Sequence, residues 1–361
     1  MPVRSLLLTG FRCFDTEVVE PDPFGLTVLR GPNGAGKTSV LEALSWLATG
    51  RSWRTSSRDA LVRAGTAHAV LRAELADPAR RLSVEADIPR EGPVKVRVNG
   101  QVVSRRADVA EALRVVLFSP DDLALVSGGP AGRREMVDDV LATRHSRWEA
   151  LQRDVDRILR QRGALLHQSA GRIDTAAAAT LDVWDARLAS AGTALADARQ
   201  ALVDLLDPLV AAAHRRIAGV GPGVRLAYQR SWEGDLGDAL ANSRVEDVRR
   251  RATGVGPHRD DVLVWLADRP ARTHASQGEQ RSVALALRLG AYHLILGDGG
   301  APPVLLLDDV FSELDPVRAS ALVAELPTGQ VLLTTAVEPP SGVSPDRVLD
   351  VSEGRIAAGA S

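Results

Sequence analysis

The residues best suited to chemistry are GPNGAGKT, at positions 31–38, which fit the pattern G-x-x-x-x-G-K-[ST] without a mismatch. Small residues in this pattern let backbone N–H groups surround the phosphates of a nucleotide. Lys37 would bring a compact positive charge to the phosphates, and the Thr38 hydroxyl would bind Mg²⁺. The chain has only two lysines, Lys37 and Lys95, so a lysine in this tight loop is informative. The motif predicts that the chain binds ATP and Mg²⁺.

The predicted phosphate loop joins a strand to a helix, because LTVLR precedes it and an apolar stripe of helical spacing follows it up to Gly50. A helix that begins at the loop would add the positive end of its dipole to the phosphate site. The predicted nucleotide-binding residues here are Gly31, Pro32, Asn33, Gly34, Ala35, Gly36, Lys37, Thr38 and Ser39.

A second candidate site is the pair Asp308 and Asp309, which follows the apolar run Val304–Leu307. Such a run is typical of a central parallel strand covered on both faces, and open α/β sheets bind ligands at the carboxyl ends of their strands. We expect Asp308 to hold Mg²⁺, directly or through water, and Asp309 to orient or deprotonate the attacking water. The alternative is a polar strand end that leads into a turn.

A third candidate site is SQGE, at positions 276–279, before another helical stripe. Ser276 and Glu279 fit a capping box, so one interpretation is simply a well-capped helix. The other is that Ser276, Gln277 and Gly278 present a hydroxyl and backbone N–H groups to a second anion. Arg12, in FRCF, either approaches the base or ribose edge of the nucleotide or is a surface charge at a strand end.

These motifs resemble those of a known family. SQGEQ resembles the signature loop of ABC ATPases, which contacts the γ-phosphate held by the other subunit, and SELD at 312–315 resembles their D-loop. The start LLLTGFRCF and the blocks at 118–138 and 256–261 resemble the RecF family of bacterial recombination-repair proteins. The resemblance extends over essentially the whole chain. It implies an α/β fold with an ABC-ATPase-type P-loop core, an antiparallel β subdomain and an inserted, mainly helical lobe.

The resemblance also implies a function: an ATP-dependent DNA-binding protein of recombinational repair and replication restart. Such a protein would dimerise on ATP, with each nucleotide held between the phosphate loop of one copy and the Ser276 loop of the other. It would bind double-stranded, gapped or junction DNA, with single-stranded DNA as a further candidate, cooperate with RecR- and RecO-type partners, and contribute to SOS induction.

Three departures from the ABC pattern suggest slow, at most DNA-stimulated ATP hydrolysis. No glutamine stands at 118–122, where the Q-loop is expected; Thr334 and Thr335 stand where many relatives have a switch histidine; and Asp309 replaces the glutamate usual in transporter subunits. A DNA clamp that binds ATP with negligible turnover is therefore an alternative. A membrane-transporter ATPase subunit is another, although the 238 residues between Lys37 and Ser276 far exceed the insert of such subunits.

The rest of the chain predicts the organisation around these sites. We expect an ATPase core lobe at 1–118 and 300–361, and a helical lobe at 119–299 that carries the Ser276 loop. Alternating runs at 67–75, 81–87 and 94–103 predict antiparallel strands, with a hairpin turn at Asn99-Gly100. Between residues 184 and 209 apolar residues recur every 3.5 positions on average, which predicts a short coiled-coil stub or a core helix.

Composition limits the kinds of partner that the chain could bind. The formal net charge of −2 gives no global basic field, so DNA would need a local arginine patch. Acidic residues interleave with the candidate arginines, so a solvated, salt-bridged face is equally expected. One cysteine, Cys13, and no long apolar stretch predict a cytoplasmic protein without a membrane span. The candidate arginines are Arg133, Arg134, Arg144, Arg147, Arg153, Arg157, Arg160, Arg249, Arg250 and Arg251.

Overall fold

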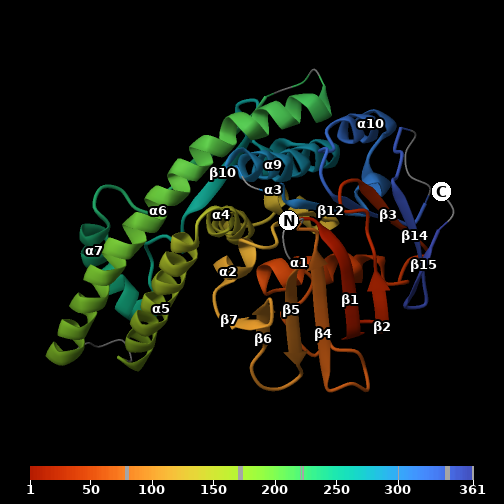
Figure 1. Cartoon of the computed structure of the whole chain (residues 1–361). Coiled ribbons are helices and arrows are strands. Elements are labelled where there is room, and N and C mark those ends of the chain that lie inside the picture. Colours follow the sequence, from red (N-terminus) through yellow and green to blue (C-terminus); the bar gives the residue numbers. More distant parts are fainter. Residues whose placement is uncertain are drawn as a thin grey trace. The chain divides into compact units, whose positions relative to one another are not determined.

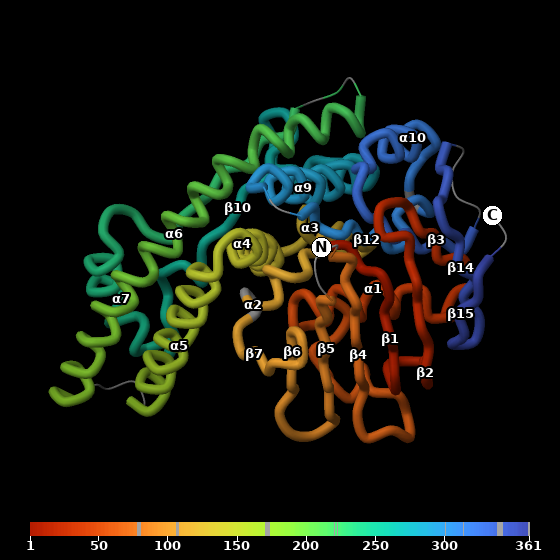
Figure 2. Tube along the Cα trace, viewed as in Figure 1, coloured from red at the N-terminus to blue at the C-terminus, as the bar shows by residue number. Residues whose placement is uncertain are grey.

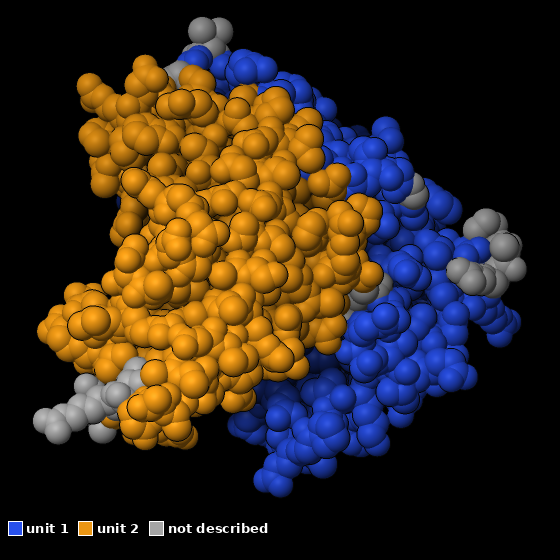
Figure 3. Space-filling view, turned by 90° about the vertical axis from the view of Figure 1, so that its left-hand side faces the viewer, with its two compact units in different colours: residues 1–123, 212–221, 277–361 blue, residues 124–211, 222–276 orange. Residues whose placement is uncertain are grey.

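The computed structural model describes residues 1–77, 81–169, 174–219, 221, 223–299, 301–337 and 342–359. The chain divides into two compact units, coloured separately in Figure 3. Unit 1 comprises 1–123, 212–221 and 277–361, and unit 2 comprises 124–211 and 222–276. These divisions fall at other residues than those of the expected lobes, since the helix that begins at Gln277 belongs to unit 1. Residue 300, an expected boundary, lies outside the described residues.

Unit 1 contains a mixed six-stranded sheet in the order β15-β14-β3-β13-β12-β8. All neighbouring strands in it are parallel except β14 and β15, which form an antiparallel hairpin. Every residue of β12 is buried, as its continuous apolar run predicts. The strands are β3 (Leu26–Arg30), β8 (Val115–Phe118), β12 (Val304–Asp308), β13 (Val331–Thr335), β14 (Arg347–Ser352) and β15 (Arg355–Ala358).

A second, antiparallel sheet of unit 1 has the order β2-β1-β4-β5-β6-β7, and β1, β2, β4 and β5 lie side by side in Figure 1. The hairpin between β6 and β7 turns at Asn99 and Gly100, both with positive φ (52° and 77°), as a two-residue turn requires. The antiparallel subdomain predicted from the sequence is therefore confirmed. Its strands are β1 (Val3–Phe11), β2 (Phe14–Val19), β4 (His68–Leu75), β5 (Leu82–Pro89), β6 (Lys95–Val98) and β7 (Gln101–Val103).

Helix α1 (Lys37–Thr49) is the centre of unit 1, because it packs against strands of both sheets. Eleven of its 13 residues are buried. It ends at Gly50, whose left-handed backbone (φ 71°) lets its N–H bond to the Trp46 carbonyl at 2.7 Å. The buried Gln330 amide joins the two sheets, since it exchanges two hydrogen bonds with the backbone of Val3.

The remaining helices of unit 1 are short, apart from α9. Helix α9 packs against β8 and η1, and Arg288 of α9 donates two hydrogen bonds to Asp122 of η1. Helix α3 (Leu123–Ser127) begins at Leu123, the last residue of the first segment of unit 1, and its other residues belong to unit 2. The helices are α2 (Arg106–Ala110), η1 (Pro120–Asp122), α9 (Gln277–Gly297), η2 (Val310–Glu313) and α10 (Pro316–Ala324).

Unit 2 is mainly helical, as predicted, with a small antiparallel sheet in the order β11-β10-β9. Over the described ranges given above, no helix has both the length and the apolar character that a membrane span needs. Besides most of α6 (Thr175–Ala218), unit 2 contains α4 (Pro130–Arg144), α5 (Ser146–Gln168), β9 (Val224–Gln229), α7 (Leu236–Arg250), β10 (Asp261–Leu266), β11 (Arg269–Pro270) and α8 (Ala271–His274).

Helix α6 (Thr175–Ala218) runs without interruption for 44 residues, about 66 Å, and can be followed as one coil in Figure 2. It is longer than the stub that the 3.5-residue repeat predicts. Of the predicted stripe, Leu188, Leu195, Ala198 and Leu202 are buried, while Trp184 and Ala191 are half-buried. Leu205 is exposed, and Leu206 is buried instead. An α-helix has 3.6 residues per turn, so its buried face drifts away from a strict 3.5-residue repeat.

Buried ion pairs hold unit 2 together. Arg162 of α5 has no exposed side-chain surface and contacts Asp185 at 2.7 Å and Asp247 at 2.8 Å. Arg199 of α6 forms a second buried pair with Asp138, and it also donates to the Pro257 carbonyl at 2.6 Å.

The block GPHRDD, at 256–261, acts as a packing centre within unit 2. Asp260 accepts hydrogen bonds from the Tyr228 hydroxyl and from the Ser231 N–H, and Asp261 pairs with Arg133. Contacts within unit 2 thus explain a motif whose role could not be assigned from its residue types.

We predict that Arg162→Met destabilises the protein by about 3–5 kcal/mol, because it leaves the buried Asp247 carboxylate without its cation. Urea unfolding followed by circular dichroism measures the change. Arg157→Ala is the matched control: Arg157 lies on the same helix but forms an exposed pair with Asp154, and its removal should cost within about 0.5 kcal/mol. Equal losses for the two variants would contradict the assignment.

Candidate phosphate-binding site

The loop 31–36 joins β3 to α1, as the sequence predicts, and its geometry requires glycine at Gly36. This residue precedes α1 with a left-handed backbone (φ 115°). A methyl group there would lie 2.7 Å from Cys13 Sγ and 2.8 Å from Phe14 Cζ. Both the backbone angle and the close approach exclude other residues, so the loop is held tightly against the end of β1 and the start of β2.

Lys37 lies inside the loop. Its Nζ donates hydrogen bonds to the carbonyls of Gly31 at 2.8 Å and Pro32 at 2.9 Å, and 7% of the residue is exposed. Burial lowers the pKa of this amine, while the charges of Asp309 and Asp308 act in the opposite direction. The ammonium is thus held where a phosphate group could replace the two carbonyls as its partner.

Three side chains meet at the carboxyl end of β12. The hydroxyls of Thr38 and Thr334 both donate to Oδ1 of Asp308, at 2.8 Å and 2.7 Å. Burial raises the pKa of the Asp308 carboxyl, and the two hydroxyl contacts oppose that effect. Thr38 follows β3 and Thr334 lies near the end of β13, so three neighbouring strands of the sheet bring these groups together.

Asp309 has an unusual backbone, with a positive φ of 47° just before η2. Its N–H donates to the Thr334 hydroxyl at 3.0 Å. A positive φ is uncommon in residues other than glycine, and such strain is concentrated at functional sites. The turn places Asp309 at the wall of the phosphate cavity.

The phosphate cavity has a volume of about 450 Å³, within the range of nucleotide-sized ligand sites. Of the predicted residues, Arg12, Asn33, Gly34, Gly36, Lys37, Thr38, Ser39 and Asp309 line it. The sequence did not single out Arg54 and Cys13, which also line it. Arg54 is one of several arginines in this part of the sequence, and only its position in the folded chain shows that it belongs to the site.

A buried glutamate holds two arginines at the rim of this cavity. Glu42 of α1 is fully buried and accepts two hydrogen bonds from the Arg12 guanidinium. Arg54 and the Ser52 hydroxyl contact the same carboxylate. Arg12 also donates to the Ala60 carbonyl at 2.8 Å. The Arg12 side chain is therefore fixed at the site, rather than being a mobile surface charge.

The residues of the predicted signature loop lie elsewhere. Ser276 is the last residue of unit 2, and Gln277, Gly278 and Glu279 form the first turn of α9. Within the described part of the chain, the lining of the phosphate cavity includes none of the four. A single copy of the chain thus does not bring the phosphate loop and Gln277–Glu279 to one cavity.

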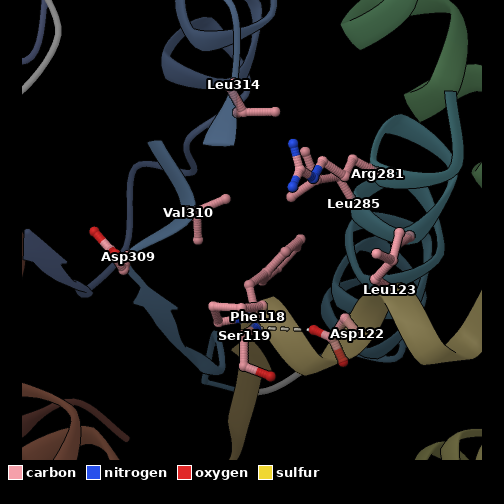
Figure 4. A pocket seen from close by; sticks show the side chains of 11 residues that line it. Phe118, Ser119, Asp122, Leu123, Arg281, Leu285, Asp309, Val310 and Leu314 are labelled. Carbon is pink, nitrogen blue, oxygen red and sulfur yellow. Dashed lines mark hydrogen bonds between the residues drawn. The ribbon is translucent and has the colours of Figure 1, made fainter. Parts of the chain in front are cut away.

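A narrow hollow adjoins the site, with room of about 40 Å³, enough for a few water molecules. Figure 4 shows Phe118 and Leu285 facing it from β8 and α9, and Val310 from η2. Asp309 lines both this hollow and the phosphate cavity. The segment expected at the Q-loop position, 118–122, therefore packs next to the strained Asp309 turn, with Ser119 and Asp122 joined at 2.9 Å.

Oxygen donors at the site fit a magnesium ion shared with a nucleotide. Among the described residues, no cluster of three or more histidine, cysteine or acidic side chains could hold a metal alone. Mg²⁺ usually binds through one or two protein oxygens together with phosphates and waters. The Thr38 hydroxyl and the Asp308 carboxylate, 2.8 Å apart, provide such a donor set.

The candidate DNA-contacting arginines divide into two groups. Arg133 is buried against Asp261, and Arg134 donates to the Asp260 carbonyl, so the expectation that Arg133 belongs to a surface patch is wrong. On α5, by contrast, Arg153, Arg157 and Arg160 are exposed. Their spacing of four and three places them on one face of the helix.

Comparison with known proteins agrees with this geometry. A family model described as RecF/RecN/SMC N terminal domain matches residues 2–340. A DNA replication and repair protein RecF of Frankia alni is 43% identical over 94% of both chains, and one of Streptomyces avermitilis is 40% identical over 99% of both. A solved structure of the recombination mediator protein RecF, described as RecF-ATP in the RecFOR pathway, has a TM-score of 0.91 at 24% identity. It covers 99% of this chain and 98% of that one.

An SMC head bound to the C-winged helix domain of ScpA is a more distant structural match. It has a TM-score of 0.59 at 14% identity and covers 100% of this chain and 98% of that one. Sheets, phosphate loop and acidic strand end thus define a P-loop protein of the RecF/RecN/SMC class. Within that class, the chain belongs to the RecF family of DNA replication and repair proteins.

We predict that Asp308→Asn raises the midpoint of thermal unfolding at neutral pH. The raised pKa means that folding opposes ionisation of Asp308. The protonated Asp308 carboxyl therefore stabilises the folded state relative to the ionised one. This stabilisation is complete below the pKa of about 3.9 that the group has in the unfolded chain, and it is lost as pH rises through its pKa in the folded state. The difference in stability between wild type and variant should therefore shrink on acidification. Asparagine can still accept the two hydroxyl bonds, so a lower midpoint at pH 7 would contradict the assignment.

Proposed function

We propose that this protein binds ATP and Mg²⁺ in the phosphate cavity and uses the bound nucleotide to join two copies of the chain. The observation that carries the proposal is the 2.8 Å contact between the Thr38 hydroxyl and Asp308, which builds a Mg²⁺ donor set beside the phosphate loop. The RecF-ATP description of a similar structure supports ATP as the ligand.

Each residue has a role in this proposal. Backbone N–H groups of the loop would surround the phosphates, and Lys37 would exchange its two carbonyl partners for phosphate oxygens. Thr38 and Asp308 would hold the metal, which neutralises phosphate charge when bound. Arg12, fixed by Glu42, would contact the outer part of the nucleotide.

Hydrolysis would depend on Asp309, whose strained turn places it at the cavity wall. We propose that it orients the attacking water, with slow turnover, because threonines at 334 and 335 stand where many ABC ATPases have a sensor histidine. If wild type and Asp309→Asn both hydrolyse ATP no faster than background, with and without DNA, the alternative of a DNA clamp with negligible turnover is favoured. Membership of the RecF family favours DNA repair over the transporter alternative.

The position of Gln277–Glu279 outside the phosphate cavity supports the proposed self-association. Ser276, Gln277, Gly278 and Glu279 are absent from the lining of the phosphate cavity in the described chain, so they would act on the nucleotide of a second copy. The γ-phosphate would then stabilise the dimer, and its hydrolysis would weaken it. The dimer is the proposed state in which double-stranded, gapped or junction DNA is bound.

The exposed arginines of α5 are the proposed DNA contact. Arg153 and Arg157 have side chains that are 54% and 62% exposed, paired with Glu149 and Asp154 of the same helix. Phosphates can displace such exposed partners at little cost. Because a similar structure is described in the RecFOR pathway, RecR- and RecO-type proteins are the proposed partners. The cytoplasm is the proposed location.

We predict that ATP with Mg²⁺ shifts the sedimentation coefficient of the protein from monomer to dimer at micromolar concentration. In Lys37→Arg, the protein concentration at which this shift is half complete should rise at least about tenfold. The reason is that a guanidinium cannot take the place of the ammonium between two loop carbonyls. Lys95→Arg, at the exposed first residue of β6, is the matched control and should behave as wild type. The proposal fails if wild-type protein sediments identically with and without ATP.

We predict that the affinity for gapped DNA falls steeply with salt and shows little base preference. Replacing Arg153, Arg157 and Arg160 by glutamine should reduce the slope of log K against log salt by about 2–3, close to 0.9 for each lost phosphate contact. Gel-shift titrations between low and moderate salt measure the slope. Arg72→Gln, which removes an exposed arginine of β4, serves as the control. An unchanged slope in the triple variant would exclude this face of α5.

A further inference from the structure

Arg318 links the two loops that the proposed dimer would turn toward its partner. It is the third residue of α10, directly after the segment that resembles a D-loop, at 312–315. A methyl group added at Gly278, in the first turn of α9, would lie 2.8 Å from Nη1 of Arg318 and 3.7 Å from its Cζ. The guanidinium therefore lies directly against the glycine of the predicted signature loop.

The other contact of Arg318 is with the end of the D-loop-like segment. Its Nη1 lies 3.1 Å from Oδ2 of Asp315. Asp315 also begins α10, because its Oδ1 accepts hydrogen bonds from the N–H groups of Val317 and Arg318. One guanidinium thus joins the start of α10 to the start of α9, 37 positions apart in sequence when counted from Asp315 to Gly278.

The neighbourhood of Arg318 is partly buried and charged. Only 28% of its side chain is exposed. The buried His214 of α6 lies close enough that the positive charge of Arg318 lowers its pKa, after the larger effect of burial, while Glu279 of α9 acts in the opposite direction. Burial and the charge of Arg318 thus both act against protonation of His214.

Gly278 has no positive φ, so its backbone does not require glycine. The absence of a side chain instead leaves room for the Arg318 guanidinium. The Arg318 guanidinium thus lies against the Gly278 residue itself, at the start of α9, rather than against a side chain.

We infer that Arg318 is a positioning residue that holds the Gly278 turn and the Asp315 turn in a fixed relation, so that both can face the nucleotide bound by a second copy. The inference rests on the proposed ATP-dependent dimer. A local role is the competing explanation, in which Arg318 only pairs with Asp315 within the first turn of α10. The two differ in whether the dimer depends on the residue.

Sedimentation and ATP hydrolysis over a range of protein concentrations test the inference with Arg318→Ala and Arg318→Gln. At protein concentrations too low for dimerisation, each variant should bind a fluorescent ATP analogue with a Kd within about twofold of wild type, because the phosphate cavity does not include Arg318. The protein concentration for half-maximal dimerisation, and for half-maximal specific ATPase activity, should rise at least about tenfold. Higher protein concentration should restore the activity, which a local loss of structure would not allow.

Arg355→Ala provides the matched control, since the Arg355 side chain in the same unit is 78% exposed, and its loss should leave every quantity unchanged. Dimerisation of both Arg318 variants at the wild-type concentration would overturn the inference while leaving the proposed function intact. Failure of the wild type to dimerise with ATP would overturn the proposed function, and the inference with it. Thermal melting shows whether Arg318→Ala is misfolded. If it is, the dimerisation of the milder Arg318→Gln variant tests the inference.

Discussion

The contact between the Thr38 hydroxyl and Asp308 is the interaction on which the rest of the site depends. It joins residues 270 positions apart and requires both to stand at the same edge of one sheet. The sheet order places β13 between β3 and β12, so Thr334 reaches the same carboxylate oxygen from the strand between them. The order of strands, rather than any single loop, therefore determines where a metal and a phosphate could meet.

This arrangement has a cost in stability that function explains. Asp308 is a buried carboxylate with hydroxyl partners but no ion-pair partner among its described hydrogen bonds. Asp309 adds a strained backbone at the next position. Natural proteins tolerate such local penalties at sites of binding or catalysis and offset them elsewhere. Here the extensive burial of α1 between two sheets is the most direct source of compensation.

Sequence reasoning succeeded where a signal is local. The phosphate loop, the apolar β12 run and the Asn99-Gly100 turn each depend on neighbouring residues, and the structure has all three as predicted. It failed where tertiary contacts decide. Arg133 and Arg153 look alike in sequence, yet one is buried against Asp261 and the other is exposed. Composition alone cannot separate them, because arginine can serve either a buried ion pair or a solvated surface.

The same limit applies to the rim of the phosphate cavity. Arg54 is recruited by Glu42, and the sequence offers no reason to prefer it to Arg51 or Arg58. Length was also misjudged in α6, since the apolar repeat covers residues 184–209 whereas the helix runs from Thr175 to Ala218. Periodicity indicates which side of a helix is covered, while the end of a helix depends on the capping residues beyond its last turn.

The scarcity of lysine has a practical consequence for chemical labelling. Lys37 is enclosed by loop carbonyls, and the terminal amine of Met1 is held by the Ala112 carbonyl with its pKa lowered to about 6. Lys95, exposed on β6, is the remaining amine. An amine-reactive dye would therefore modify Lys95 and also the Met1 amine, because its lowered pKa leaves that amine uncharged at neutral pH, in both cases without touching the phosphate cavity.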